Sequence, residues 1–123
     1  MAIVGASPNP ERPSYRVANY LKDKGYRVIP VNPNAQEVVG EISYPDLASI
    51  PEKVEVVDIF RRSEDIMPIV EEAIKIEAKV VWMQEGIINE EAAVKARDAG
   101  LLVVMDKCML KEHQRSIKQG RLD

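Results

Sequence analysis

The chain has 123 residues, of which 30% are charged, and its 17 basic and 20 acidic side chains give a net charge of −3. This length fits one domain with a single core, and the acidic balance argues against nucleic-acid binding, which needs a basic face. No apolar run approaches the roughly 20 residues of a membrane span, and no secretory leader precedes the first expected strand. One cysteine excludes an internal disulfide and, with one histidine, argues against a dedicated zinc or iron site. We therefore expect one cytoplasmic domain over residues 1–123, with neither nucleic-acid nor membrane partners.

Apolar runs alternate with helical patterns along the whole chain. Short strands are predicted at 2–4, 27–31, 54–60, 79–83 and 101–105, and helices at about 14–24, 63–76, 89–100 and 106–119. Ser14 is the expected N-cap of the first helix, and Pro68 predicts a kink or a loosely joined first turn in the second. The stretch 35–49 is expected to be a loop, with an extended piece at 42–44 and one helical turn at 45–50. The alternation predicts an α/β fold of the Rossmann-like, doubly wound type, with a five-stranded parallel sheet.

In such a sheet a ligand binds beyond the carboxyl ends of the strands, where the strand order reverses. The sequence places five short segments at these ends: 5–14, 32–34, 60–62, 84–86 and 106–108. We therefore look for the site among them.

The first of these segments has the character of a phosphate-binding loop. A buried strand reaches Gly5, passes through a proline-rich loop and enters a helix, whose first N–H groups attract anions. Arginine suits phosphate oxygens, and the same edge carries Arg12, Arg61 and Arg62 together with hydroxyls of Ser7 and Ser14. The alternative interpretation of the arginines is that they are solvated surface charges.

NAD is the obvious ligand of such a fold, and two features argue against it. Ser7 and Pro10 stand where the dinucleotide fingerprint has its later glycines. The second strand ends in Asn32-Pro33, where an acidic residue would hold the ribose hydroxyls.

Five segments together resemble the small stand-alone CoA-binding protein family, whose members are similar to the CoA-binding domain of the succinyl-CoA synthetase alpha subunit. The segments span almost the whole chain in the right order: Val4-Gly5-Ala6-Ser7-Pro8-Asn9-Pro10, Val31-Asn32-Pro33, Val57-Asp58-Ile59-Phe60-Arg61-Arg62, Val81-Trp82-Met83-Gln84-Glu85-Gly86-Ile87 and Met105-Asp106-Lys107-Cys108-Met109. The resemblance implies coenzyme A as the ligand. The phosphohistidine segment of the synthetase has no counterpart, so succinyl-CoA synthesis is not implied.

The resemblance also implies which residues contact coenzyme A. The loop from Gly5 through Ser14 would meet the phosphates, and the end of the second strand would line the nucleotide side. Phe60 and Arg61 would flank the adenosine or the pyrophosphate, and the segment after the fourth strand would border the pantetheine arm. The predicted binding residues are Gly5, Ala6, Ser7, Arg12, Ser14, Asn32, Pro33, Phe60, Arg61, Arg62, Gln84, Gly86 and Cys108.

Cys108 is the best candidate for chemistry, because it lies beside Lys107 and near a helix start, conditions that lower a thiol pKa. We expect it either to form a reversible disulfide with the CoA thiol or to be an inert buried cysteine. His113 is poorly spaced to serve as its base, and a packing role is favoured. Asp58 lies among apolar neighbours and needs a partner, which we expect to be the N–H groups of the first loop.

These observations favour a module that binds CoA or acyl-CoA, as a carrier or sensor, over a stand-alone enzyme. One alternative is a non-catalytic, subunit-like component of an acyl-CoA synthetase with a partner subunit. Another is a redox or nucleotide sensor that binds NAD(H). The chain is expected to be a monomer or a small homo-oligomer.

Overall fold

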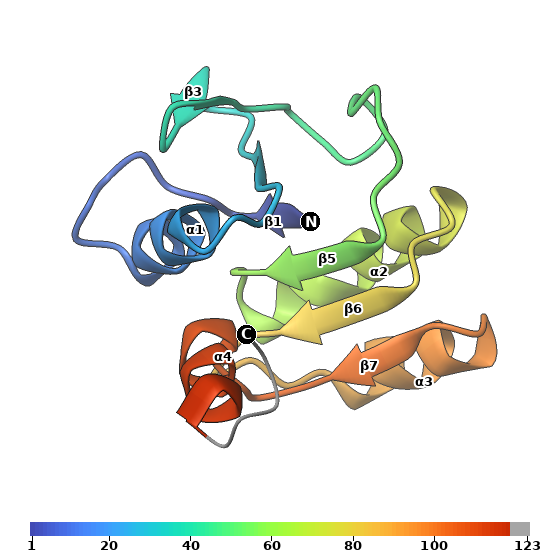
Figure 1. Ribbon diagram of the computed structural model, residues 1–123. Helices are drawn as coiled ribbons and strands as arrows, with labels where there is room; N and C mark the ends of the chain where they lie inside the picture. The colour runs from blue at the N-terminus through green and yellow to red at the C-terminus, as the bar shows by residue number, and fades with distance from the viewer. Residues whose placement is uncertain (119–123) are drawn as a thin grey trace.

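Parallel strands and helices alternate through the computed structural model, which describes residues 1–118 (Figure 1). The elements are β1 (Ala2–Val4), α1 (Pro13–Asp23), β2 (Ile29–Val31), β3 (Glu37–Val38), β4 (Glu41–Ile42), β5 (Val56–Ile59), the 3-10 turn η1 (Ser63–Asp65), α2 (Ile66–Lys75), β6 (Val80–Met83), α3 (Glu90–Asp98), β7 (Leu102–Val104) and α4 (Met109–Lys118). All five predicted strands are present, each shorter than or equal to its prediction. The predicted end of the last helix at residue 119 lies outside the described residues.

The five strands form one parallel sheet in the order β2-β1-β5-β6-β7. The chain first moves outward from β1 to β2, then returns to the other side of β1 at β5 and continues to β7. Strand order therefore reverses between β1 and β5. α1 and α4 pack on one face of the sheet, and α2 and α3 pack on the other (Figure 1). The predicted doubly wound α/β fold is confirmed.

β1 is buried on both faces because its position is central. Ala2, Ile3 and Val4 are at most 5% exposed, and they pair with β2 on one side and β5 on the other. Ala2 and Val4 join the core under α2 and α3, whereas Ile3 faces α1 and α4. An apolar residue at every position of this strand is what two buried faces require.

Pro30 is tolerated in β2 because this strand is at the edge of the sheet. Ile29 donates its N–H to the carbonyl of Met1, 2.9 Å away, so the neighbouring Pro30 directs its missing donor position away from β1. On that outer side Tyr44 donates to the carbonyl of Pro30 at 3.0 Å and accepts from the N–H of Asn32 at 2.9 Å. The predicted extended piece around residue 44 therefore closes the edge of the sheet.

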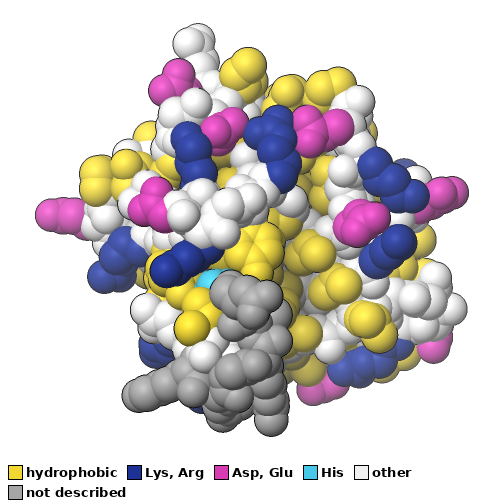
Figure 2. Space-filling view, viewed as in Figure 1, with side chains coloured by type: hydrophobic (Ala, Val, Ile, Leu, Met, Phe, Trp, Pro, Cys, Tyr) yellow, Lys and Arg dark blue, Asp and Glu magenta, His cyan; other side chains and the backbone are white. Residues whose placement is uncertain are grey.

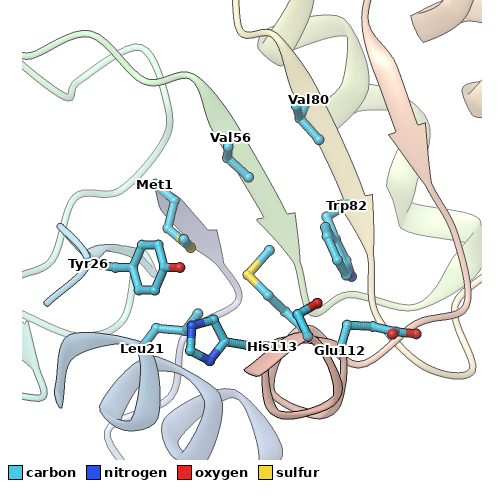
Figure 3. Close-up of a pocket in the computed structure, with 10 residues that line it drawn as sticks. Met1, Leu21, Tyr26, Val56, Val80, Trp82, Glu112 and His113 are labelled. Atoms are coloured by element: carbon cyan, nitrogen blue, oxygen red, sulfur yellow. The ribbon is translucent and has the colours of Figure 1, made fainter. Parts of the chain in front are cut away.

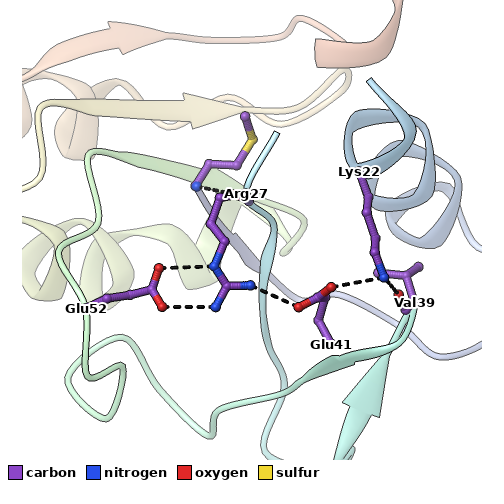
Figure 4. A network of polar contacts seen from close by, with 6 residues as sticks. Lys22, Arg27, Val39, Glu41 and Glu52 are labelled. Carbon is purple, nitrogen blue, oxygen red and sulfur yellow. Dashed lines mark hydrogen bonds and ion pairs between the residues drawn. The ribbon is translucent and has the colours of Figure 1, made fainter. Parts of the chain in front are cut away.

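A chain of charged side chains fastens the β3–β4 hairpin beside α1 (Figure 4). Arg27 holds Glu52 and Glu41, each at 2.9 Å, and Lys22 reaches Glu41 at 3.0 Å and the carbonyl of Val39 at 2.6 Å. Each exposed pair contributes only about 0.2–1 kcal/mol, so the network orients the hairpin more than it stabilises the fold.

Several local predictions need correction. α1 begins at Pro13, and its N-cap is Arg12, not Ser14. Proline at the first helical position has the right φ and lacks only an N–H that the helix would leave unpaired. The hydroxyl of Ser14 instead accepts the N–H of Ser7 at 3.0 Å, which folds the first loop against the helix.

The second predicted helix starts with a separate turn. α2 begins directly after η1, and Pro68 is the third residue of α2, so the loosely joined first turn is confirmed. Residues 45–50 form bends and a turn rather than a helical turn.

The turn after β1 requires glycine. Gly5 has a φ of +85°, and a Cβ at this position would lie less than 3.0 Å from the carbonyl oxygen of Phe60, closer than real Cβ atoms approach. Gly25, after α1, has a similar φ of +92° but open space around it.

Substitution of these two glycines separates backbone strain from steric conflict. Gly25→Ala is expected to lower the free energy of unfolding by about 1 kcal/mol, the usual cost of a positive φ for alanine. Gly5→Ala is expected to lower it by about 3 kcal/mol or more, because β1 and β5 must also move apart. Urea denaturation of the two variants measures the difference, and equal losses would contradict the close approach of Gly5 to Phe60.

Candidate functional site

An open cleft of about 650 Å³ lies where the strand order reverses, beyond the carboxyl ends of β1 and β5. Its lining comes from the loop between β1 and α1, the start of α1, the segment after β5, and the loop after β6. These residues are Gly5, Ser7, Arg12, Pro13, Ser14, Phe60, Arg61, Arg62, Asp65 and Ile87. Seven of the predicted binding residues thus meet in one cleft, and the sequence-based location of the site is consistent with this geometry.

The first loop is held in place by its own polar side chains. Ser7 donates its N–H to Ser14, as described above, and its hydroxyl accepts the N–H of Asn9 at 3.1 Å. The Asn9 side chain accepts the N–H of Glu11 at 3.0 Å. No side chain caps α1, so the positive end of this helix opens towards the cleft. A preformed loop beside an uncapped helix start is a suitable anion site.

The cleft carries two arginines without an acidic partner in the described part of the chain. Arg12 is exposed and Arg61 is half-buried, and neither forms an ion pair among residues 1–118. Arg62 differs, because its guanidinium lies 3.5 Å from Glu64 and 3.3 Å from Asp65. Arg12 and Arg61 are therefore the cations available to a ligand.

Two of the predicted residues, Ala6 and Asn32, are joined to each other by a hydrogen bond and do not line the cleft. The Asn32 side chain donates to the carbonyl of Ala6 at 2.8 Å and accepts the N–H of Asn34 at 2.8 Å. Ala6 is fully buried. With both ends of its amide used, Asn32 braces the first loop from the end of β2, and the exposed Pro33 follows it.

The loops after β6 and β7 are fastened to each other beside the cleft. Gly86 donates its N–H to the Asp106 carboxylate at 2.6 Å, and the indole of Trp82 donates to the carbonyl of Lys107 at 2.8 Å. These bonds fix the position of the loop after β7, which carries Cys108 and leads into α4. Gln84, Gly86 and Cys108 do not line the cleft itself, whereas their neighbour Ile87 does.

Asp58 has a different partner from the one that its sequence context predicts. The carboxylate is fully buried in β5, and one of its oxygens accepts a hydrogen bond from the side chain of Gln84, not from the first loop. The other oxygen has no partner within the described residues. Burial raises the pKa of Asp58 to about 7, although the Gln84 bond and the Ile59 backbone act in the opposite direction.

His113 has the packing role that the sequence favours. Its Nδ1 lies 2.9 Å from the hydroxyl of Tyr20, and its ring meets Tyr20 and Tyr26 edge-on, with centroids 5.5 Å apart in both cases. The histidine thereby joins α4 to α1. With its Nδ1 engaged by Tyr20, no Cys108–His113 dyad is observed in the described structure.

A second cavity, of about 330 Å³, opens on the face of the sheet that carries α1 and α4 (Figure 3). Met1, Val56 and Val80 line it at the amino ends of their strands, with Tyr26 and Trp82. Apolar side chains are exposed on the same face (Figure 2). Because its lining is almost entirely apolar, this groove offers few partners for an anion, unlike the cleft at the opposite end of the strands.

Two residues of the cleft lie outside the predicted segments, Asp65 and Ile87. Pro13 lies within the predicted loop 5–14, although it was not singled out as a binding residue, and it is the first residue of α1. Asp65 enters the cleft because the segment after β5 turns as a 3-10 helix before α2, and the sequence gives no local sign of this.

The fold defines an α/β domain of the Rossmann-like type, with an open cleft where the strand order reverses. The family model described as a CoA binding domain matches residues 1–114, and the chain belongs to this family. Residues 1–118 include no helix long and apolar enough to cross a membrane. The same part of the chain has no group of three acidic, histidine or cysteine side chains arranged to hold a metal ion.

Several relatives match over most of their length. A solved hypothetical protein from Pyrococcus horikoshii OT3 is 50% identical, with a TM-score of 0.92 over 94% of this chain and 82% of that one. A structure from Thermus thermophilus is 38% identical, with a TM-score of 0.89 over 93% and 87%. The uncharacterized protein YneT of Bacillus subtilis is 38% identical over 113 residues, which are 92% of this chain and 84% of YneT.

Larger enzymes contain a similar domain. An ADP-forming acetate–CoA ligase of Archaeoglobus fulgidus is 33% identical over 57 residues, 45% of this chain but only 8% of the ligase. The acetyl-coenzyme A synthetase 1 of Ca. Korarchaeum cryptofilum is 28% identical, with a TM-score of 0.76 over 85% of this chain and 26% of that one. The relation to acyl-CoA synthetases is therefore to their CoA-binding domain.

The Asp58 carboxyl predicts an unusual dependence of stability on pH. The folded state binds this proton more tightly than the unfolded state, whose pKa is the ordinary 3.8. Below pH 4 Asp58 is protonated in both the folded and the unfolded state, so it does not lower the stability of the fold. As the pH rises to about 7, the unfolded state loses this proton first and the free energy of unfolding falls. Relative to the native protein, Asp58→Asn is expected to gain about 4 kcal/mol of unfolding free energy between pH 4 and pH 8.

Denaturation in urea across this pH range measures the difference. Asp98→Asn, at an exposed position in α3, is the matched control and should follow the native protein at every pH. If the unfolding free energy of Asp58→Asn follows that of the native protein at every pH, ionisation of Asp58 does not lower the stability of the fold, and the prediction is wrong.

Proposed function

We propose that the protein binds coenzyme A, or an acyl-CoA, in the cleft at the carboxyl ends of β1 and β5. The observation that carries this proposal is the meeting of an uncapped helix start, a preformed serine loop and two unpaired arginines in one cleft. Coenzyme A has a pyrophosphate and a 3′-phosphate, so it presents several anionic groups to such a surface. Membership of the CoA-binding domain family supports the same ligand.

In this arrangement the first loop and the start of α1 hold the pyrophosphate through backbone N–H groups and the Ser7 hydroxyl. Arg12 and Arg61 pair with phosphate oxygens, and Phe60 packs against the adenosine. The pantetheine arm runs past Ile87 towards the loops that carry Gly86 and Cys108. The protein acts as a binding or carrier module.

Loss of one free guanidinium should weaken binding without changing the fold. Arg61→Gln is expected to raise the Kd for CoA about tenfold, because a charge-assisted hydrogen bond to phosphate contributes about 1.5–3 kcal/mol. Isothermal titration calorimetry measures the Kd. Arg97→Gln, on the exposed surface of α3, is the control and should bind as the native protein does.

The same titration, run with other ligands, tests the identity of the ligand. CoA should bind with a sub-millimolar Kd, and NAD should not displace it, because β2 ends in Asn32-Pro33 and the Asn32 amide is already engaged. Displacement by NAD at similar concentration, or no CoA binding at sub-millimolar concentration, would contradict the proposal.

We further propose that Cys108 exchanges with oxidised CoA. The Cys108 thiolate attacks one sulfur of a CoA disulfide, a Cys108–CoA disulfide forms, and the second CoA leaves as a thiolate that takes up a proton. The thiol is half-buried and unpaired with any other cysteine, and it directly precedes the first residue of α4.

Intact-protein mass spectrometry after incubation with CoA disulfide tests this exchange. The native protein should gain the mass of one CoA that survives denaturation and is lost on adding a reducing thiol. Cys108→Ser should gain no such mass while it still binds CoA reversibly by calorimetry. Absence of an adduct in the native protein would remove Cys108 from the site but leave the binding proposal intact.

A second candidate function is that of a non-catalytic component of an acyl-CoA synthetase. The similarity to 26% of the Ca. Korarchaeum cryptofilum synthetase supports it, since that chain carries this fold as one part of a larger enzyme. Acyl-CoA formation that requires both this protein and a separate nucleotide-binding subunit would favour this function over a carrier.

A further inference from the structure

A buried pair of polar side chains lies directly beneath the start of α4. Asp58 in β5 is fully buried, and Gln84, which follows β6, is 3% exposed. The Gln84 amide donates from its nitrogen to Asp58, and its oxygen accepts the N–H of Met109 at 3.3 Å. Both ends of the amide are thus used, which fixes its orientation.

The second of these bonds caps a helix that has no suitable cap of its own. Met109 is the first residue of α4, and the residue before it is Cys108, whose thiol is a weak hydrogen-bond acceptor. Gln84 supplies the missing oxygen from the loop after β6. The position of the Cys108 backbone therefore depends on Gln84, and the orientation of Gln84 depends on Asp58.

Asp58 is short of one partner in either protonation state. As a carboxylate it accepts from Gln84 with one oxygen, and its second oxygen is buried without a donor. As a neutral acid it keeps the Gln84 bond, and the charge that burial disfavours is gone. Burial raises the pKa of Asp58 to about 7, so both protonation states are accessible near neutral pH.

We propose that Asp58 is a positioning residue for Cys108: through Gln84 it fixes the start of α4, and its charge controls the reactivity of the thiol. This inference rests on the proposed role of Cys108 in the site. The ionised Asp58 lies one glutamine side chain away from the residue after Cys108, so it opposes formation of a second negative charge on the thiol. The neutral acid leaves the positive end of α4 free to stabilise the thiolate.

The other titratable groups around this pair are identifiable. The strands beside Asp58 contribute Ile3 and Trp82 in register, neither of which titrates, and α4 contributes His113, which is engaged by Tyr20. Near the thiol, the charged side chains are Asp106, Lys107, Lys111, Glu112 and Glu85, the last paired with Lys111 at 3.0 Å. Asp58 is the only fully buried acid in this part of the described structure.

Two variants separate the charge of Asp58 from its anchoring role. Asp58→Asn keeps an oxygen for Gln84 and removes the charge, whereas Asp58→Leu removes both. The probe is the aromatic disulfide DTNB, which a thiolate attacks with release of a coloured thiolate, so that the rate reports Cys108 without any CoA. Circular dichroism of each variant establishes that it is folded.

The native protein should show an inflection near pH 7 in the logarithm of the DTNB rate, in addition to the ionisation of the thiol itself. Asp58→Asn should lose this inflection and react roughly tenfold faster at pH 8, because the buried negative charge no longer opposes the thiolate. Asp58→Leu should also lose the protection of the Met109 amide in hydrogen exchange, which Asp58→Asn should retain.

Glu85→Gln and His113→Gln are the controls, the first for an exposed acid near the thiol and the second for the histidine that joins α4 to α1. Both should keep the inflection. Its persistence in Asp58→Asn, or unchanged protection of Met109 in Asp58→Leu, would overturn the inference. Calorimetry with CoA on the same variants tests the binding proposal separately, since the DTNB rate does not depend on a bound ligand.

Discussion

The close approach of Gly5 to Phe60 is the constraint on which the cleft depends. Backbone bonds hold the end of β1 on both sides: Gly5 donates to the carbonyl of Val31 in β2 at 2.9 Å, and Phe60, directly after β5, donates to the carbonyl of Val4 at 2.8 Å. Because no side chain separates Gly5 from β5, the first loop lies directly against the end of that strand. Arg61 follows Phe60 at the same point, which places its guanidinium beside the loop that the uncapped α1 completes.

The architecture was readable from the sequence because each strand of the sheet is a short apolar run and helical patterns separate these runs. β1 is apolar at every position, as a central strand must be, and Asn89 caps α3 through a 3.0 Å bond from the N–H of Ala92. These signals act within a few residues. The edge of the sheet that presents the ligand follows from them, since the carboxyl ends of parallel strands always lie together.

What the sequence did not reveal are contacts between residues far apart in the chain. Serine is a common N-cap residue, yet the helix begins one residue earlier, at Pro13, and the hydroxyl of Ser14 accepts the N–H of Ser7 instead. Asn32 was expected to line the nucleotide side, and its amide is used to hold Ala6, 26 residues away. A polar side chain at a strand end can face a ligand or brace a neighbouring loop, and only the three-dimensional arrangement decides between the two.

The binding edge divides into two parts with different physical character. The part formed by the first loop and Arg61 is open and positively charged, although the chain as a whole has a net charge of −3. Some exposed acids elsewhere are paired with bases, among them Glu52, Glu71 and Glu85. Arg12 and Arg61 have no acidic partner among residues 1–118. The part around the half-buried Cys108 is formed by the joined loops after β6 and β7, and the buried Asp58 lies beneath it.

These two parts favour a ligand with a charged group at one end and a different group at the other. A nucleotide or a free phosphate can occupy the open, charged part alone and makes no contact with the part around Cys108. Coenzyme A carries its phosphates at one end and a thiol at the end of a long, weakly polar arm, so a single molecule can occupy both parts. In the proposed complex, the separation of its charged and reactive ends lets one molecule meet the phosphate loop and the Cys108 loop at once. A change in the charge of Asp58 would then act at the thiol end, away from Arg12 and Arg61.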